Sequence, residues 1–244
     1  MLSPKPWRTE AVMFLIAGVF FCLCLGAFLS SSLHHAHVRG FKTEDSAGNV
    51  IIGTLSFHGA VWALLPFFLW AHRVDWRTAF GWRDEHLKRT LGRTLLTLLL
   101  VFPIVMVLQS VSAEVLEKLG RSSENQLAVD LILNAKSPWL RAYLGFFAVV
   151  LAPVAEEFVF RGVLYPFVKQ LGFPKLAWVG VSLLFAFIHD DAQIFVPLFV
   201  LALALTWLYE RTDNLLAPIL MHGLFNAANL VLLLVITTWP AHHE

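Results

Sequence analysis

The chain has 244 residues, of which 58% are hydrophobic and 14% charged, and its mean hydropathy is +0.69. A soluble domain carries about 25% charged residues, so this composition excludes an ordinary soluble protein. The formal net charge of +1 gives no indication of a nucleic-acid partner. The apolar residues lie in runs long enough to cross a bilayer, which predicts a polytopic membrane protein.

Three apolar segments are predicted to span the membrane in the first part of the chain. The first covers residues 11–33 and is longer than the core of a signal peptide, so it is interpreted as a retained span. The second covers residues 50–71 and the third residues 91–109. The basic, aromatic loop between these two would suit nucleic acid in a soluble protein. Beside two spans it is better interpreted as a connection lying on anionic headgroups.

A polar region separates these spans from the rest of the chain. A short helix is expected over residues 113–119, with Gly120 as its C-cap. A second helix is expected to follow, because Ser123 and Gln126 have the spacing of a capping box, and to end before Pro138. Its apolar residues fall on one helical stripe, which predicts an amphipathic segment lying at the membrane interface.

Four further apolar segments complete the chain, at residues 144–168, 176–189, 194–209 and 215–237. The expected fold is therefore all-α, a transmembrane helix bundle with about seven spans, within a range of six to eight. Residues 1–141 are expected to form N-terminal spans plus the amphipathic segment. Residues 142–238 are expected to form the core helices of the same membrane domain.

The distribution of basic residues predicts the orientation. With the N-terminus in the cytoplasm, the inside segments hold eleven Lys and Arg residues and the outside segments six. Positively charged residues are enriched in cytoplasmic loops, so an N-terminus on the cytoplasmic side is expected.

Three charges lie inside the apolar segment 144–168, at Glu156, Glu157 and Arg161. A charged side chain in hydrocarbon costs about 2.5–3.5 kcal/mol on insertion scales, so this cluster needs a compensating function. Glu157 and Arg161 are i, i+4 and are expected to form an ion pair. Glu156 is rotated by about 100° on the helix and is expected to face a cavity, with Pro153 bending the helix nearby.

Three other polar residues lie in two later apolar segments: His189, His222 and Asn226. Each alone is readily explained as a packed, hydrogen-bonded residue of a membrane helix. Because His222 and Asn226 are one helical turn apart and the set comes from separate helices, the combination with the glutamates favours a polar active site.

These residues resemble the motifs of a known family. Glu156-Glu157-x-x-x-Arg161, Phe185-x-x-x-His189 and His222-x-x-x-Asn226 are similar to the three motifs of the CPBP family of intramembrane proteases, which includes CAAX-prenyl endopeptidases of the Rce1 type and bacterial Abi proteins. The resemblance covers about residues 144–233, with the motifs in the family's order. It implies a glutamic-type endopeptidase, located in the bacterial inner membrane.

Peptide hydrolysis needs an activated water and donors for the oxyanion. Glu156 is the expected general base, and His189 is expected to hold the same water. His222 and Asn226 are expected to donate hydrogen bonds to the oxyanion, in agreement with the roles that the resemblance implies.

The remaining motif residues are expected to support the site. Glu157 and Arg161 would organise it, and Phe185 would pack against the wall of the cavity one turn from His189. No cofactor is expected.

Three alternatives stay open. Glu156, His189 and His222 could hold zinc as a His2Glu site, although the chain has no HExxH motif. The protein could instead be a membrane scaffold or immunity factor that binds a partner without cutting it. A proton-coupled transporter is a weaker alternative, because no inverted repeat is found in the sequence.

The expected partners follow from the same resemblance. They are the lipid bilayer and a membrane-anchored protein or peptide substrate, cleaved near its C-terminus; no nucleic acid is expected.

Overall fold

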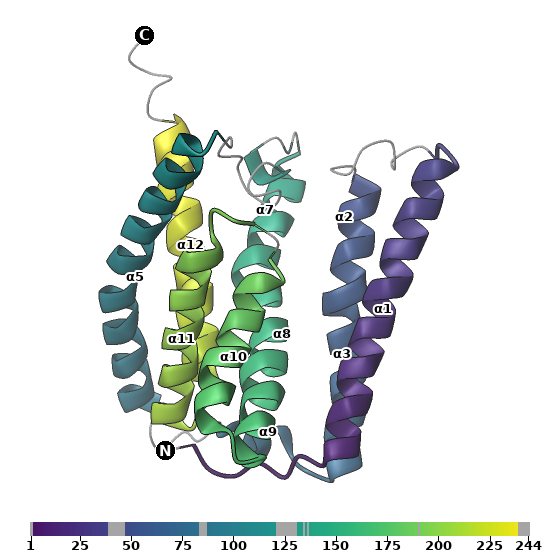
Figure 1. Ribbon diagram of the computed structural model, residues 1–244, viewed down its shortest axis with the longest axis vertical. Helices are drawn as coiled ribbons and strands as arrows, with labels where there is room; N and C mark the ends of the chain where they lie inside the picture. The colour runs from purple at the N-terminus through teal and green to yellow at the C-terminus, as the bar shows by residue number, and fades with distance from the viewer. Residues whose placement is uncertain are drawn as a thin grey trace. The chain divides into compact units, whose positions relative to one another are not determined.

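The computed structural model describes residues 2–38, 47–82, 87–120, 131–133, 135, 137–189 and 191–238. Helices make up most of these residues, and no strand occurs among them (Figure 1). The all-α prediction is therefore confirmed.

Six helical segments of the described chain are long and apolar enough to cross a membrane, and a shorter apolar helix covers Pro174–Phe187. The six are Thr9–His35, Ile51–His72, Leu87–Lys118, Pro138–Gln170, Phe195–Thr212 and Leu216–Val235. The expected number of about seven, within a range of six to eight, agrees with this result. The protein is an integral membrane protein of the helical type.

The chain divides into two compact units. One unit is Lys5–Ala79 and contains α1 (Thr9–His35), α2 (Ala47–Thr54), the π-helical turn η1 (Leu55–Gly59) and α3 (Ala60–His72). The helices α1 and η1 approach closely at Gly26, where an added Cβ would lie 1.8 Å from Ser56 Oγ. Small residues are the usual way to bring membrane helices together, since little apolar driving force exists between helices in lipid.

The other unit comprises Met1–Pro4 and Phe80–Glu244. The short helix α4 (Trp76–Phe80) ends at its boundary, and α5 (Leu87–Lys118) follows. A continuous helical path then runs through α7 (Pro138–Phe146), η3 (Phe147–Leu151), α8 (Ala152–Glu157), η4 (Phe158–Leu164) and α9 (Tyr165–Gln170). The unit closes with α10 (Pro174–Phe187), α11 (Phe195–Thr212) and α12 (Leu216–Thr238).

An apolar core joins three helices of this second unit. Its members come from α5, α11 and α12, and include Val105, Leu201, Leu205, Met221 and Phe225, all buried. The side chains of Phe102 and Phe225 meet edge to face, with ring centroids 5.5 Å apart. This core fixes α11 and α12, which carry residues of the site described below.

The structure corrects the boundaries expected after the third span. The predicted third span and the predicted separate helix at residues 113–119 form one continuous helix, α5. It ends where expected, since Gly120 has φ +74° and donates its N–H to the Glu117 carbonyl over 2.9 Å. The predicted amphipathic helix lies largely outside the described residues, which resume at 131. Pro138 begins α7 rather than only ending a helix.

Candidate active site

The expected ion pair within the fourth span is present and fully buried. Arg161 Nη1 donates to Glu157 Oε1 over 2.8 Å, and neither side chain is exposed. Removing two such charges from water is costly, and additional hydrogen bonds to the pair offset part of that cost.

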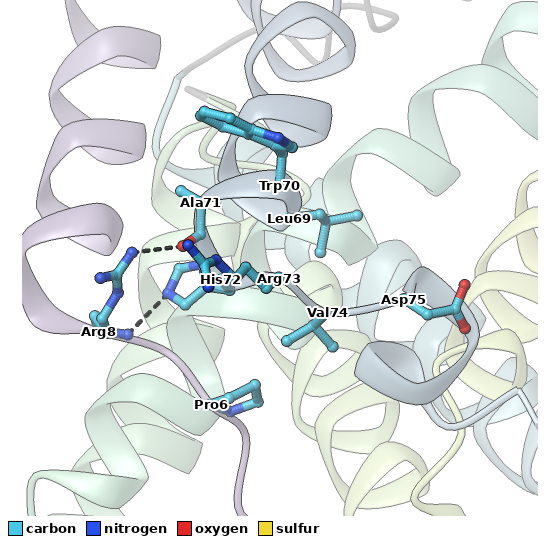
Figure 2. Close-up of a pocket in the computed structure, with 9 residues that line it drawn as sticks. All are labelled: Pro6, Arg8, Leu69, Trp70, Ala71, His72, Arg73, Val74 and Asp75. Atoms are coloured by element: carbon cyan, nitrogen blue, oxygen red, sulfur yellow. Dashed lines mark hydrogen bonds between the residues drawn. The ribbon is translucent and has the colours of Figure 1, made fainter.

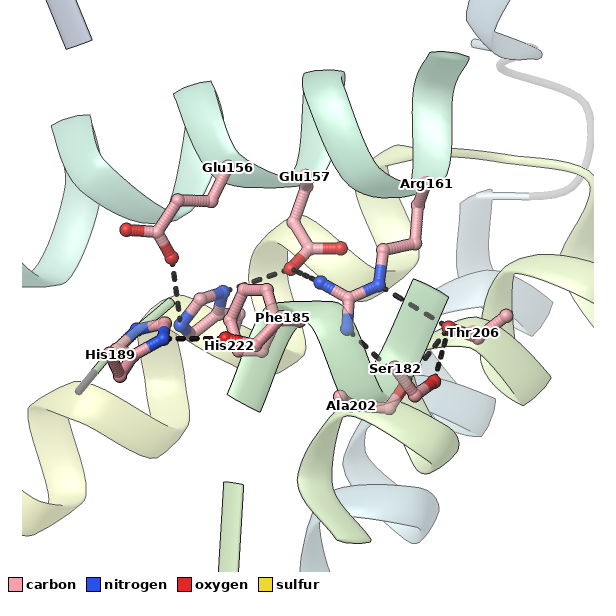
Figure 3. Close-up of polar contacts among 9 residues, drawn as sticks. All are labelled: Glu156, Glu157, Arg161, Ser182, Phe185, His189, Ala202, Thr206 and His222. Atoms are coloured by element: carbon pink, nitrogen blue, oxygen red, sulfur yellow. Dashed lines mark hydrogen bonds and ion pairs between the residues drawn. The ribbon is translucent and has the colours of Figure 1, made fainter. Parts of the chain in front are cut away.

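Arg161 reaches two further helices. Its Nη2 donates to the Ala202 carbonyl over 3.2 Å, its Nε donates to Thr206 Oγ1 over 3.4 Å, and its guanidinium lies 4.5 Å from the centre of the Phe185 ring. Figure 3 shows these groups at one end of the polar cluster, with Ser182 beside Thr206. Arg161 therefore links η4 to α10 and α11.

Glu157 has a second partner that the sequence did not indicate. His222 Nδ1 lies 2.9 Å from Glu157 Oε1, and His222 is 3% exposed. Because an ionised carboxylate only accepts hydrogen bonds, Nδ1 carries the proton. This interaction fixes the imidazole of α12 against α8, and it directs Nε2 toward the remaining carboxylate.

That carboxylate is Glu156. Its Oε2 lies 3.8 Å from His222 Nε2, and its side chain is 13% exposed, whereas that of Glu157 is fully buried. His222 therefore lies between two carboxylates, one on each ring nitrogen (Figure 3). The expected rotation of the two glutamates on the helix places them on different sides of the imidazole.

His189 lies just beyond the end of α10 with one nitrogen engaged. Its Nδ1 lies 2.7 Å from the Phe185 carbonyl oxygen, and since a carbonyl can only accept, Nδ1 is the donor. In the neutral ring, Nε2 is then an acceptor. The Phe185 ring contacts both histidines, with centroid distances of 4.8 Å to His189 and 5.7 Å to His222. Figure 3 shows His189 at the same end of the cluster as Glu156 and His222.

Asn226 contacts the backbone of η3. Its Nδ2 donates to the Ala148 carbonyl over 2.8 Å. In η3 the Ala152 N–H bonds to Phe147, five residues earlier. The same pattern would pair Ala148 with residue 153, which is a proline without an N–H. Asn226 therefore satisfies a carbonyl that the helix leaves without a partner.

The helix that carries His222 and Asn226 approaches η3 through a glycine. A Cβ at Gly223 would lie 2.6 Å from the Val149 carbonyl oxygen, so any larger residue would push the two helices apart. The structure thus brings Glu156, Glu157, Arg161, Phe185, His189 and His222 into one cluster. It places Asn226 one turn from His222 on the same helix.

Sequence reasoning missed several groups of this site. The hydroxyls of Ser182 and Thr206 are buried and lie 3.4 Å apart, and Thr206 also donates to the Ala202 carbonyl over 2.9 Å. Hydroxyl residues inside apolar helices were the available signal, but such residues commonly bond to their own backbone. The π-helical turns on both sides of α8 were also missed; such turns are frequent at functional sites.

The geometry of Glu156, His189 and His222, the residues of the zinc alternative, agrees only in part with a zinc site. Among the residues that the structure describes, no group of three or more His, Cys, Asp or Glu side chains is arranged to hold a metal ion. Both His189 and His222 nevertheless donate Nδ1–H to an oxygen, which is the usual arrangement of zinc-bound histidines. The metal dependence of the site stays a prediction.

Comparison with known proteins finds a family similarity in the C-terminal part of the chain. Residues 138–228 match the family model described as Rce1-like, type II CAAX prenyl endopeptidase. Every residue of the cluster and Asn226 lie within this match.

Two proteins of Lactococcus lactis subsp. lactis (strain IL1403) are similar to the chain. UPF0177 protein YaiF is 29% identical over 126 residues, which cover 49% of this chain and 53% of YaiF. UPF0177 protein YxdF is 26% identical over 78 residues, which cover 32% of this chain and 42% of YxdF. The chain spans about half the length of the curated relatives it matches. No solved structure matches it.

Proposed function

Because residues 138–228 match the Rce1-like family model, which confirms the resemblance to the CPBP family, we propose that the chain is an intramembrane endopeptidase. The observation that carries this proposal is the position of His222, buried between Glu157 and Glu156 inside an apolar helix bundle. A histidine held by one carboxylate and facing another is an arrangement for proton transfer, and its burial is hard to explain by packing alone.

The first step requires an activated water. Glu156 is the general base, because it is the more exposed of the two carboxylates, whereas Glu157 is fully buried and accepts a hydrogen bond from Arg161. The 3.8 Å between Glu156 Oε2 and His222 Nε2 is too long for a direct hydrogen bond. One water can bond to both groups at ordinary distances of 2.7–3.2 Å. His189 Nε2, an acceptor in the neutral ring, orients the same water.

The second step requires donors for the oxyanion that forms when the water attacks the peptide carbonyl. His222 Nδ1–H is committed to Glu157, so Nε2 must carry a second proton in order to donate. The proposed role therefore needs the imidazolium form, flanked by two carboxylates. Asn226 has two amide hydrogens, and one is used on Ala148, which leaves one for the oxyanion.

The protons balance within this set. Glu156 accepts one proton from the attacking water and delivers it to the nitrogen of the leaving amine as the peptide C–N bond breaks. The products are a carboxylic acid and an amine, which exchange one proton and leave as a carboxylate and an ammonium, and no metal or cofactor is required. Glu157 and Arg161 hold His222 in place throughout, and Phe185 packs between the two histidines and the guanidinium.

The proposed substrate is a membrane-anchored protein or peptide that is cleaved near its C-terminus. The bilayer delivers such a substrate to a site buried within the spans. We place the enzyme in the bacterial inner membrane with its N-terminus in the cytoplasm.

The Glu156→Gln variant tests this function. The C-terminal peptides of membrane proteins are compared by mass spectrometry between cells that carry the wild-type protein and cells that carry the variant. The amide keeps the shape of the side chain but is not a base, so processed C-termini present with the wild type are expected to fall at least 100-fold. Glu114→Gln is the matched control, since Glu114 is exposed and pairs with Lys118 on the surface of α5.

Identical C-terminal peptides in both cell lines would remove the protease function and favour a scaffold or immunity protein. A cleavage assay on purified protein, with and without a chelator, distinguishes the metal-free glutamic mechanism from the zinc-dependent one. Activity that persists after chelation supports the glutamic mechanism. Activity that chelation abolishes and zinc alone restores would support Glu156, His189 and His222 as zinc ligands, an alternative with which the Nδ1 hydrogen bonds of both histidines are compatible.

A further inference from the structure

A cavity that contains none of the active-site motif residues lies within the Lys5–Ala79 unit. It has a volume of about 1060 Å³ and is formed between the residues that precede α1 and the end of α3. Figure 2 shows Arg8, His72 and Arg73 close together, with Asp75 at the other end of the group. None of the residues in the proposed mechanism belongs to it.

The position of this cavity on the spans is defined by the helix ends. The first span begins at Thr9, directly after Arg8, and the second span ends at His72, directly before Arg73. Both ends therefore meet at the level of the lipid headgroups. Trp70, which also lines the cavity, is 79% exposed, as is typical of the aromatic residues that anchor helices at a membrane interface.

The wall of the cavity is built by hydrogen bonds. His72 Nε2 accepts the backbone N–H of Arg8 over 2.9 Å, and His72 Nδ1 donates to the Phe68 carbonyl over 2.7 Å. Both nitrogens of this histidine are thus used within the wall. Arg8 Nη2 donates to the Ala71 carbonyl over 2.5 Å, which holds the guanidinium at the cavity.

Arg73 has an unusual backbone for an arginine. Its φ is +53°, in the left-handed region, and the N–H groups of Arg73 and Val74 bond back to Trp70 and Leu69. This is the Schellman ending of a helix, in which glycine is the common residue at the left-handed position. The left-handed conformation is energetically unfavourable for an arginine, and backbone strain of this kind is often found at functional sites.

The charges favour an anion. Two guanidiniums line the cavity, and the one carboxylate, Asp75, accepts the backbone N–H groups of Arg77 and Thr78 over 3.0 and 3.3 Å. The net charge of these three side chains is +1, which complements a headgroup with one negative charge. Arginine also binds phosphate through paired N–H groups.

We propose that this cavity binds the phosphate of an anionic glycerophospholipid, with Arg8 and Arg73 as its donors. The location at two helix ends favours a lipid over free phosphate, because the acyl chains can remain beside the spans while the phosphate enters the cavity. The apolar side chains of Leu69, Trp70 and Val74 provide contact for the glycerol and the first methylenes.

The Arg73→Gly variant tests the site with the least disturbance, since glycine keeps the left-handed backbone and removes the guanidinium. The full-length protein, purified in neutral detergent, is titrated with phosphatidylglycerol, with phosphatidylcholine and with inorganic phosphate. Bound lipid is measured by native mass spectrometry, and Tm is recorded in parallel. Arg77→Gln is the matched control, because it removes the same charge from an arginine that lies over Trp76 outside the cavity.

The wild type is expected to prefer phosphatidylglycerol to phosphatidylcholine. Arg73→Gly is expected to weaken phosphatidylglycerol binding about fivefold, equivalent to about 1 kcal/mol for one basic residue, with Tm in the absence of lipid retained. Arg77→Gln is expected to change phosphatidylglycerol binding less than twofold. An equal loss in both variants would overturn the site and leave general surface charge as the cause. Stabilisation by inorganic phosphate as strong as that by phosphatidylglycerol would overturn the lipid as its ligand.

Discussion

Arg161 shows how a full positive charge is accommodated within the bundle. Its guanidinium donates to Glu157, Ala202 and Thr206 and lies over the Phe185 ring, so its charge is compensated by groups from α8, α10 and α11 together. Glu157 in turn accepts from both Arg161 and His222. The charge of Glu157 is therefore shared between a structural cation and the candidate catalytic histidine.

Replacement of Arg161 by methionine tests this compensation. The variant leaves Glu157 buried without its cation, and breaking a buried pair in this way costs about 3–5 kcal/mol. We expect the free energy of unfolding in detergent to fall by that amount and activity to be lost with it. Denaturant titration of the purified protein measures the change.

A double variant separates stability from chemistry. Glu157→Gln combined with Arg161→Met removes the uncompensated charge, so most of the lost stability is expected to return. Activity is expected to remain at least tenfold below wild type, because glutamine still accepts the His222 Nδ1–H but supplies no negative charge beside the imidazolium. Wild-type activity in this double variant would show that Glu157 has no part in the reaction.

The residue spacing predicted part of this network. The i, i+4 relation of Glu157 and Arg161 is enough to predict their pairing, since it depends on one helix alone. The contact of Glu157 with His222 joins residues 65 positions apart, and that of Arg161 with Thr206 joins residues 45 apart. Such contacts depend on how four helices pack, and no local pattern in the sequence encodes them.

At the scale of elements, the π-helical turn η3 explains why α12 docks where it does. Pro153 and the i→i−5 bond of Ala152 leave the Ala148 carbonyl without a backbone donor, and Asn226 supplies one. One turn of α12 thus carries a structural contact, a close approach at Gly223 and the histidine of the candidate site. The π-helical turn η3 therefore determines where along its length α12 contacts the neighbouring helix.

Gly223→Ala tests this docking. Its Cβ would lie 2.6 Å from the Val149 carbonyl, a backbone atom that cannot rotate away, so α12 must shift. We expect a loss of about 1–3 kcal/mol in stability, as for overpacking of a core, and a fall in activity of more than tenfold as His222 leaves its position. Thermal unfolding and peptide cleavage are measured on the same preparation.

Gly92→Ala provides the matched control on α5, where a Cβ would have no atom within 4 Å. Alanine is the better helix former, so the control is expected to keep activity and to gain up to about 1 kcal/mol in stability. Equal activity in Gly223→Ala and in the control would contradict the requirement for close contact between α12 and η3.

Element boundaries were predictable only where a local signal exists. Gly120 ended its helix as expected, because the left-handed conformation at a helix end favours glycine. The end of the apolar run near residue 109 was misread as the end of a helix, although α5 continues to Lys118. Polar residues change the environment that a helix passes through, but they do not break its backbone hydrogen bonds.

At the scale of the molecule, the C-terminal unit holds every residue of the proposed mechanism. Glu156, His189, His222 and Asn226 come from helices between Ala152 and Thr238 or directly beside them, and the family match covers residues 138–228. The proposed division at residue 141 stays a prediction. The first unit contributes two spans and the cavity beside Arg8, so the proposed lipid site uses different residues from the proposed chemistry.

The proposed orientation predicts which helix ends face each side. With the N-terminus in the cytoplasm and each span crossing once, Lys118 at the end of α5 lies outside, and Gln170 at the end of α9 lies inside. The nearby residues Leu119 and Phe173 are 71% and 57% exposed and suit labelling. Both are changed singly to cysteine after Cys22 and Cys24 are replaced by serine.

A maleimide that cannot cross membranes is then applied to intact spheroplasts. Leu119→Cys is expected to react at once, and Phe173→Cys only after the membrane is permeabilised, because basic residues are retained in cytoplasmic loops. The opposite pattern would place the N-terminus outside and the cavity at Arg8 in the outer leaflet. Reaction of both cysteines on the same side would show that the single crossing assumed between them, by Pro138–Gln170, is wrong.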